Sequence, residues 1–224
     1  TEFKIFNIDK NEYVKQYTTY PSKVEHTSFF TDADGDLILP DVLPLGNYRI
    51  EEVAAPFGYV LNENYVEVKV DTDTFYEVEP DTYEAIITVE YEDAPAVGEL
   101  VIEKKGEVLD AYKGGLFADS EDKEFVYREG SLAGAKFEIY AAEDIYTADM
   151  QTDENGNRNK YYAEGDLVST VVTGEDGKAK VSDLPLGKYR VVEVEAPYGY
   201  VLNKEEQYVT FVYVDDKTPV SGKV

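Results

Sequence analysis

A repeated segment constrains the fold of this chain more than any other feature of its sequence. Residues 43–62 read LPLGNYRIEEVAAPFGYVLN and residues 184–203 read LPLGKYRVVEVEAPYGYVLN, so that 15 of 20 positions are identical. A repeat of this kind indicates that one structural unit occurs twice in the chain. We therefore expect two homologous domains, at residues 1–97 and 98–224, with an insertion at residues 106–131 in the second copy.

Short segments in which apolar and polar residues alternate predict β-strands throughout both copies. The clearest lie at residues 65–71, 84–93, 99–105 and 207–214. Period-two alternation with β-branched and aromatic residues is typical of half-buried strands, and the Asp-Gly and Asn-Gly pairs between such runs indicate turns. No long amphipathic helix is predicted. The pattern favours an all-β chain that forms two tandem immunoglobulin-like β-sandwiches.

The net charge and the missing residue types exclude several classes of function. The formal charge of −26, from 47 acidic and 21 basic residues, opposes binding to nucleic acid and to anionic membranes. With no Cys and one His, Cys/His zinc sites, thiolate nucleophiles and disulfides are unavailable. His26 stands in a polar stretch without triad partners and is expected to be a solvated loop residue. We expect no enzyme active site, no cofactor and no membrane insertion in this segment.

Alignment of the two copies predicts that each lacks a strand at one end. The second copy opens with the strand at 99–105, which has no counterpart in the first. The first copy closes with the strand at 84–93, whereas the second has no equivalent after 207–214. Copy one is therefore expected to lack its first strand and copy two its last. Sheet edges left open in this way invite pairing with another chain.

Parity along the predicted strands places four ionisable residues on apolar faces: Glu52, Glu193, Asp93 and Lys104. Burying an unpaired charge is costly. Each residue taken alone is therefore interpreted as a strand-end group that reaches solvent, or as one member of a buried salt bridge. Taken as a set on strands of one repeated unit, the four residues suggest a reactive site.

Several motifs resemble those of the Cna B-type, SpaA-like domain family. The stretches Tyr48–Tyr59 and Tyr189–Tyr200 look like the family's glutamate-containing E-box. Leu132–Phe137 resembles its second strand, Val101–Lys105 its first, and Glu92–Pro95 its last. The resemblance covers most of the chain. It implies a prealbumin-like, inverse immunoglobulin sandwich of the kind found in Gram-positive pilins and adhesins.

The resemblance also implies a role for each inward-facing residue, because many members of the family form an internal Lys–Asn or Lys–Asp isopeptide bond. It assigns the amine to Lys104, with Lys105 as the alternative, and the acceptor carboxyl to Asp93, where many relatives have Asn. Glu52 and Glu193 would be the assisting acids. The chemistry is reasonable in a core, because burial disfavours charge and so brings an amine and a carboxyl towards their neutral, reactive forms.

The same residues predict that neither bond closes within these 224 residues. The first copy holds Glu52 and Asp93 but has no lysine strand, and Lys4 alternates against the apolar positions beside it. The second copy holds Lys104 and Glu193 but has no acceptor strand. Asp215 and Asp216 follow the penultimate strand and are poorly placed as acceptors.

Two acidic loops and the insertion are further candidate sites. Residues 32–43 and 153–164 each depart from the spacing of a calcium-binding loop, so acidic β-turns are favoured over calcium sites. The insertion at 106–131 is interpreted as a surface loop, with ligand binding as the alternative.

The leading expectation is a structural stalk segment of a Gram-positive surface protein or pilin-like adhesin, outside the cell and anchored to the wall. Its partners would be the neighbouring domains of the same polypeptide, and another chain through strand pairing. The alternative is an adhesive module that recognises a host ligand or carbohydrate through residues 106–131. The only reaction expected is a single self-modification, so the chain is not expected to be an enzyme.

Overall fold

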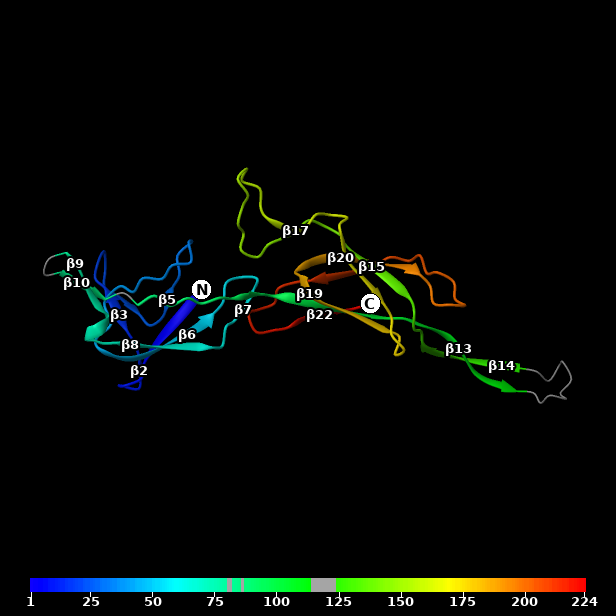
Figure 1. The fold of residues 1–224 in the computed structure, drawn as a ribbon, viewed down its shortest axis with the longest axis horizontal. Helices are drawn as coiled ribbons and strands as arrows, with labels where there is room; N and C mark the ends of the chain where they lie inside the picture. Colours follow the sequence, from blue (N-terminus) through cyan, green and yellow to red (C-terminus); the bar gives the residue numbers. More distant parts are fainter. Residues whose placement is uncertain (80–81, 86, 114–123) are drawn as a thin grey trace. The chain divides into compact units, whose positions relative to one another are not determined.

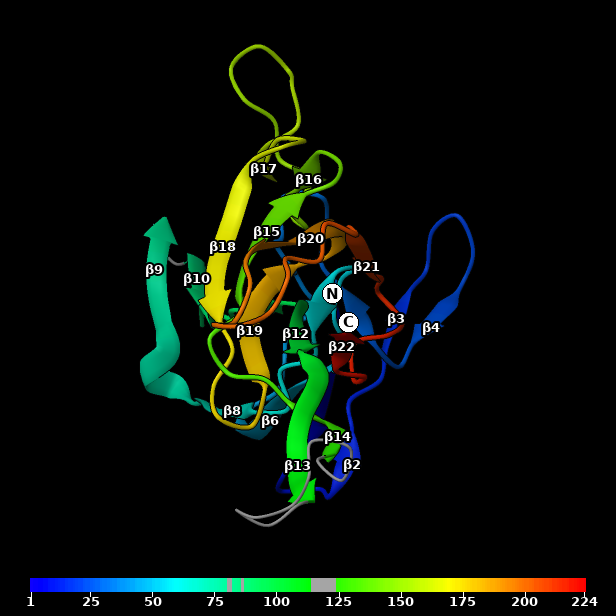
Figure 2. The same cartoon turned by 90° about the vertical axis from the view of Figure 1, so that its right-hand side faces the viewer.

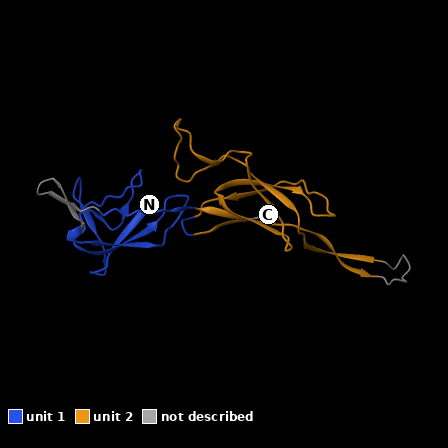
Figure 3. Ribbon diagram, in the orientation of Figure 1, with its two compact units in different colours: residues 1–95, 215–217 blue, residues 96–214, 218–224 orange. Residues whose placement is uncertain are grey.

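The computed structural model describes residues 1–79, 82–85, 87–113 and 124–224, and it separates the chain into two compact units (Figure 3). Unit 1 comprises residues 1–95 and 215–217, and unit 2 comprises residues 96–214 and 218–224. Ile86 of the expected strand at 84–93, and residues 114–123 of the expected insertion, lie outside the described residues.

Unit 1 is built around an antiparallel sheet with the order β2-β1-β6-β8, in which β5 also pairs with β1 (Figure 1). Its strands are β1 (Glu2–Asn7), β2 (Glu12–Tyr13), β5 (Phe29–Phe30), β6 (Gly46–Ala54) and β8 (Tyr65–Val70). Three two-stranded pairs complete the described part of the unit, together with a 3₁₀ turn at Thr72–Thr74. They are β3 (Gln16–Thr18) with β4 (Val24–His26), β7 (Tyr59–Val60) with β11 (Ala94–Pro95), and β9 (Phe75–Glu79) with β10 (Thr82–Ala85).

Unit 2 contains two sheets. The first has the order β18-β15-β20-β21, formed by Leu167–Val172, Lys136–Ala141, Gly187–Glu195 and Gln207–Phe211. The second has β12 (Val97–Glu103) between β19 (Lys178–Pro185) and β22 (Val220–Lys223), as the neighbouring labels in Figure 2 show. The remaining strands form two hairpins, β13 (Lys105–Lys113) with β14 (Glu124–Ser131) and β16 (Ile145–Tyr146) with β17 (Lys160–Tyr162).

The repeated segment forms the central strand of each unit, β6 in unit 1 and β20 in unit 2. Alternate residues point inward, and the two tyrosines Tyr48 and Tyr189 are 1% and 0% exposed. Each hydroxyl is satisfied by a nearby backbone carbonyl: Tyr48 donates to Pro44 at 2.8 Å and Tyr189 to Pro185 at 2.6 Å. The period-two pattern therefore predicts the inward face correctly. Each tyrosine buries its ring, and its hydroxyl, the one polar atom of the side chain, is hydrogen-bonded.

The core of unit 2 lies between its two sheets, and β12 supplies an essential part of it. Leu100 and Ile102 of β12 are 0% and 2% exposed and pack with residues of the opposite sheet. Burying a side chain of this size contributes about 1.5–3 kcal/mol relative to exposure. Gly98 allows β12 to approach that sheet closely, because a Cβ there would lie 2.5 Å from the ring of Phe211. The all-β, two-sandwich prediction is confirmed.

Two strand expectations need correction. Unit 2 does have a strand after β21, because residues Val220–Lys223 form β22 and pair in parallel with β12. The Ser-Gly-Lys sequence hides this strand from a pattern search, although Gly222 is needed there, since a Cβ would lie 2.5 Å from Val209. In unit 1, the strand expected at 84–93 ends at Ala85 in the described residues, and residues 87–93 form none.

The described residues include no helix with the length and apolarity that crossing a bilayer requires.

Candidate cross-linking sites

In unit 2, Lys104 and Glu193 form a buried ion pair. The Lys104 Nζ lies 2.9 Å from Glu193 Oε2, and the side chains are 16% and 2% exposed. The same carboxylate oxygen accepts a hydrogen bond from the backbone amide of Asn203 at 2.8 Å. Glu193 Oε1 is buried and has no hydrogen-bond partner among the described residues. One oxygen of the carboxylate therefore accepts hydrogen bonds from both Lys104 and Asn203.

The backbone fixes Lys104 at the end of β12. Its amide donates to the carbonyl of Gly177 at 2.8 Å, and its carbonyl accepts from Leu132 at 3.0 Å. Glu193 is held from the other side, because it lies on β20 and pairs in register with Phe137 of β15. The amine therefore comes from one sheet and the acid from the other, and the pair closes one end of the core.

In unit 1, the corresponding glutamate is buried beside a second acid instead of a lysine. Glu52 is 5% exposed, and its Oε2 accepts from the backbone amide of Asn62 at 2.8 Å. Burial, and then the negative charge of neighbouring Asp93, raise the pKa of Glu52 to about 7 against the opposing hydrogen bond from Asn62. Glu52 Oε1 and Asp93 Oδ1 are both buried without another donor among the described residues, and a hydrogen bond from the protonated Glu52 to Asp93 contributes to the raised pKa of Glu52.

The two sites occupy the same position in the repeated fold. Glu52 pairs in register with Phe3, as Glu193 does with Phe137. Each glutamate accepts from an asparagine amide ten residues later in the chain, at 2.8 Å in both units. Sequence reasoning missed this amide, although the signal was present, because both asparagines end the repeated GYVLN segment.

The remaining candidates do not join these sites. Lys105 is 56% exposed on β13 and lies 3.5 Å from Glu129, so it points away from Glu193. Lys4 lies over the ring of Tyr13, with its Nζ 5.6 Å from the centroid. Asp216 groups with unit 1, where its carboxylate accepts from the amide of Ala55. Among the described residues, no lysine or arginine forms a salt bridge with either acid of the unit 1 site.

A cavity of about 200 Å³ adjoins the ion pair of unit 2, and sequence reasoning did not anticipate it. Its lining includes Lys104, Phe137, Val191, Glu193 and Gln207. In unit 1, the residues that correspond in the repeat to Phe137, Val191 and Gln207 are Phe3, Ile50 and Val66, and all three contact Tyr91. The Tyr91 ring lies edge-on to Phe3 at 5.0 Å, and its hydroxyl donates to the Ile50 carbonyl and accepts from the Val66 amide.

Tyr91 precedes Asp93 by two residues, so the segment that brings Asp93 to Glu52 also places the Tyr91 ring beside it. The matching space in unit 2 is the cavity. Among the described residues, the unit 1 site thus holds two carboxyl groups, Glu52 and Asp93, whereas the unit 2 site holds a lysine and a glutamate, Lys104 and Glu193.

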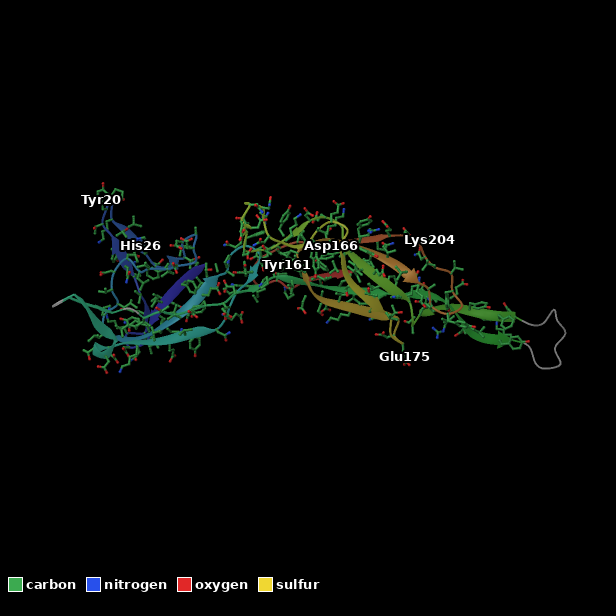
Figure 4. All side chains as sticks on the ribbon, turned by 45° about the horizontal axis from the view of Figure 1, so that its top comes forward. Tyr20, His26, Tyr161, Asp166, Glu175 and Lys204 are labelled. Carbon is green, nitrogen blue, oxygen red and sulfur yellow. The ribbon has the colours of Figure 1, made fainter. Side chains whose placement is uncertain are left out.

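His26 and the acidic turns show no arrangement for catalysis. His26, labelled in Figure 4, was expected in a solvated loop but is a half-buried residue of β4, with its Nε2 3.0 Å from the Thr18 hydroxyl oxygen. The carboxylates of Asp32 and Asp153 each accept two backbone amides of their own turn. Within the described ranges, no group of three or more His, Cys, Asp or Glu residues is placed to hold a metal ion.

Comparison with solved structures shows a shared fold. The chain matches the Bacillus anthracis TIE protein at 24% identity and a TM-score of 0.52, over 100% of this chain and 30% of that one. It therefore spans about 30% of the length of that relative. It also matches GBS52, the minor pilin of Streptococcus agalactiae, at 17% identity and a TM-score of 0.31, over 100% of this chain and 80% of that one.

A third match is BcpA*(D312A), the major pilin subunit of Bacillus cereus, at 15% identity and a TM-score of 0.28, over 99% of this chain and 93% of that one. No curated protein matches the chain. The family model for the SpaA prealbumin-like fold domain matches residues 1–84 and 126–222. With both copies of the repeat matched across most of the sequence, the chain belongs to the family of SpaA prealbumin-like fold domains.

Proposed function

We propose that this chain is a structural stalk segment of a Gram-positive surface protein. Each of its domains is of the type in which a lysine–carboxyl isopeptide bond links the first strand to the last. The observation that carries the proposal is the buried Lys104–Glu193 pair, because Glu193 occupies the position in the repeat that Glu52, beside Asp93, occupies in unit 1. A buried ion pair is weak evidence of stability by itself. A buried amine in one copy and a buried carboxyl pair in the other are better explained as groups that the same type of reaction uses in each domain.

In that reaction, the buried glutamate first takes a proton from the lysine and leaves a neutral amine. The lysine nitrogen then attacks the acceptor carboxyl carbon. A C–N bond forms, a C–O bond breaks, and the departing oxygen leaves as water with a proton supplied by the glutamic acid. Glu52 suits this role because burial and Asp93 raise its pKa to about 7, so it can hold and release a proton near neutrality. The step runs once per domain, which makes it self-modification.

A covalent tie between the first and last strands would let a domain bear load without unfolding, since it constrains the chain much as a disulfide does. The chain has no cysteine, so disulfides cannot provide that constraint. This supports a mechanical role at the surface of the cell, joined to neighbouring domains of the same polypeptide.

We expect the purified chain to contain no isopeptide bond. Lys104 belongs to unit 2 and Asp93 to unit 1, so each half-site lacks its reaction partner in its own unit. Intact mass spectrometry should return the mass calculated from the sequence. A mass lower by one water molecule, with a Lys104 cross-linked peptide after digestion, would contradict this expectation.

A second candidate function is adhesion through the hairpin β13–β14. One face of this hairpin carries Leu109, Tyr112, Phe125 and Tyr127, which are 47–57% exposed. Tyr112 and Phe125 pack together with ring centroids 5.0 Å apart. Exposed aromatic side chains grouped on one face are typical of binding surfaces.

A screen of glycans and host-matrix proteins tests this candidate. Saturable binding that is lost when all four side chains are changed to serine favours an adhesive module. Absence of binding, or binding that survives the change, favours the stalk.

A further inference from the structure

The loop between β16 and β17 contains a third copy of a turn that each repeat also has. The three turns occupy residues 32–36, 153–157 and 174–178, and the loop with the second of them extends beyond β16 and β17 (Figure 2). In each turn the amide of the first residue donates to the carbonyl of the fifth, at 2.8–2.9 Å. The fourth residue is always a glycine with a φ between 72° and 91°. Only the turn at 153–157 has an asparagine before that glycine.

Asn155–Gly156 is the only asparagine–glycine pair in the sequence, and such a pair has a reaction of its own. The backbone nitrogen that follows an asparagine can attack the carboxamide carbon, Cγ, and close a five-membered ring. Glycine favours this step because it places no side chain beside the attacking nitrogen. Asparagine is a thermolabile residue for this reason. The aspartate–glycine pairs of the other two turns are less reactive, since an ionised carboxylate is a poor electrophile.

The structure leaves the Asn155–Gly156 pair open to solvent. Asn155 is exposed, and a Cβ built on Gly156 would meet no atom within 4 Å. The equivalent glycine in the turn at 174–178 is packed against its unit, because a Cβ on Gly177 would lie 2.7 Å from the carbonyl oxygen of Lys104. The same turn is therefore held by its surroundings in the repeat and is free of them at the tip of the loop.

Asp153 restrains the turn at the tip. Its Oδ1 accepts from the backbone amides of Asn155 and Asn157, at 2.8 and 2.9 Å. Its carbonyl accepts from the amide of Gly156 at 3.0 Å, so the attacking nitrogen is engaged while the turn is intact. The turn must open before the ring can close. Exposed turns open at a low free-energy cost, so this restraint slows the reaction without preventing it.

The neighbouring Asn157 is protected. Its Nδ2 donates to Asp153 Oδ2 at 3.1 Å, and the residue that follows it, Arg158, carries a large side chain. Arg158 is itself held, because its guanidinium lies 4.6 Å from the centroid of the Tyr146 ring and its backbone forms a bridge with Thr152. The loop thus offers one reactive asparagine and, two residues later, a protected one.

We propose that Asn155 is a site of spontaneous modification, which converts it to aspartate and isoaspartate. The Gly156 nitrogen loses its proton and bonds to Asn155 Cγ. The bond from Cγ to the side-chain nitrogen breaks, and that nitrogen leaves as ammonia with the proton. Water then opens the ring at either carbonyl. One opening gives aspartate, and the other gives isoaspartate, in which the main chain runs through the side-chain carbons.

Both products change the tip of the loop. Each adds one negative charge, next to Asp153 and Glu154, to a chain whose formal charge is already −26. Isoaspartate also lengthens the backbone by a methylene group. The longer backbone does not fit the five-residue turn and should break the hydrogen bond from the Asp153 amide to the Asn157 carbonyl. Water is the only co-reactant, so the modified fraction increases with the age of the protein.

The test incubates the full 224-residue chain at neutral pH and physiological temperature. Peptide mapping by mass spectrometry should show Asn155 as the first asparagine to gain the mass difference between a carboxamide and a carboxyl group. Chromatography separates its aspartate and isoaspartate forms. A blocked peptide of residues 151–159, QTDENGNRN, reports the unrestrained reaction. The folded chain should react about threefold to thirtyfold more slowly than the peptide, because its turn must open first.

Four variants of the chain separate the contributions. G156A places a methyl group beside the attacking nitrogen and should slow the reaction about tenfold or more. D153A removes the acceptor of two turn amides and should raise the rate towards that of the peptide, whereas D153N keeps an acceptor oxygen and should not. E154A is the matched control, because it changes the adjacent exposed residue, and it should alter the rate by less than about twofold. Protection of the β20 amides shows that unit 2 remains folded.

The outcomes are distinct. Modification of Asn155 ahead of every other asparagine, slowed by G156A, supports the inference. An Asn155 that stays unmodified after the peptide has converted overturns it, as does an earlier reaction at Asn157 or at any other asparagine. Equal rates for D153A and E154A overturn the restraining role assigned to Asp153.

Discussion

Replacing Lys104 by methionine should lower the free energy of unfolding of unit 2 by about 3–5 kcal/mol, the usual cost of breaking a buried ion pair by removing one partner. Methionine keeps much of the side-chain volume, so the loss reports the charge more than the packing. It leaves the Glu193 carboxylate buried, with only the Asn203 amide as a donor. Native-state hydrogen exchange at the amides of β20 measures the effect for unit 2 alone.

The neighbouring lysine provides the control. Lys105 is 56% exposed and its ion pair with Glu129 lies at the surface, so K105M should cost less than about 0.5 kcal/mol. Adding E193Q to K104M removes the buried, unpaired charge of Glu193 and should recover most of the lost free energy of unfolding. Equal stability of K104M and K105M would show that the Lys104–Glu193 pair does not hold this end of the core.

The stability of unit 1 should fall as the pH rises from about 4.5 to about 7. Burial and the nearby Asp93 charge raise the pKa of Glu52 from 4.5 to about 7, so folded unit 1 keeps a proton that the unfolded chain releases. The unfolded state binds fewer protons in this window, and stability then decreases with pH. The full loss is about 3 kcal/mol at 1.36 kcal/mol per pH unit. Hydrogen exchange at the amides of β1 and β6, corrected for the intrinsic pH dependence, measures it.

Two glutamine substitutions test the source of this pH dependence. E52Q removes the titrating group and should flatten the profile between pH 4.5 and 7. E51Q changes the adjacent residue, whose side chain pairs with Arg49, and should keep the slope. A wild-type profile that is flat or rises with pH would show that Glu52 is ionised in the folded unit.

The alternation along a strand predicts the position of a site residue well where that strand has a pairing partner. Glu52 and Glu193 were expected on the apolar faces of their strands, and both are buried. The same alternation predicts a strand that continues through Asp93, but the described residues 87–93 form none. Alternation is a property of a segment, whereas a strand also needs a second strand to pair with, and no described strand pairs with residues 87–93.

The opposite error occurred at β22. Val220–Lys223 has no convincing alternation, yet it pairs with β12 and completes the second sheet of unit 2. Gly222 is there because the backbone passes close to Val209 and Phe211. That requirement exists only once the sheets are packed, so no local pattern could have revealed it.

The sequence by itself determined that one β-sandwich domain occurs twice, because identical residues with identical alternation must bury the same faces. It also determined which residues are unusual, since an ionisable side chain on an apolar face is visible from parity. Only the tertiary structure decided how those residues are paired. Lys104 and Glu193 are 89 residues apart in the chain and come from different sheets, and Glu52 meets an acid from a segment that follows β10. Which charges meet depends on how sheets stack, and stacking is set by long-range packing that no short stretch of sequence encodes.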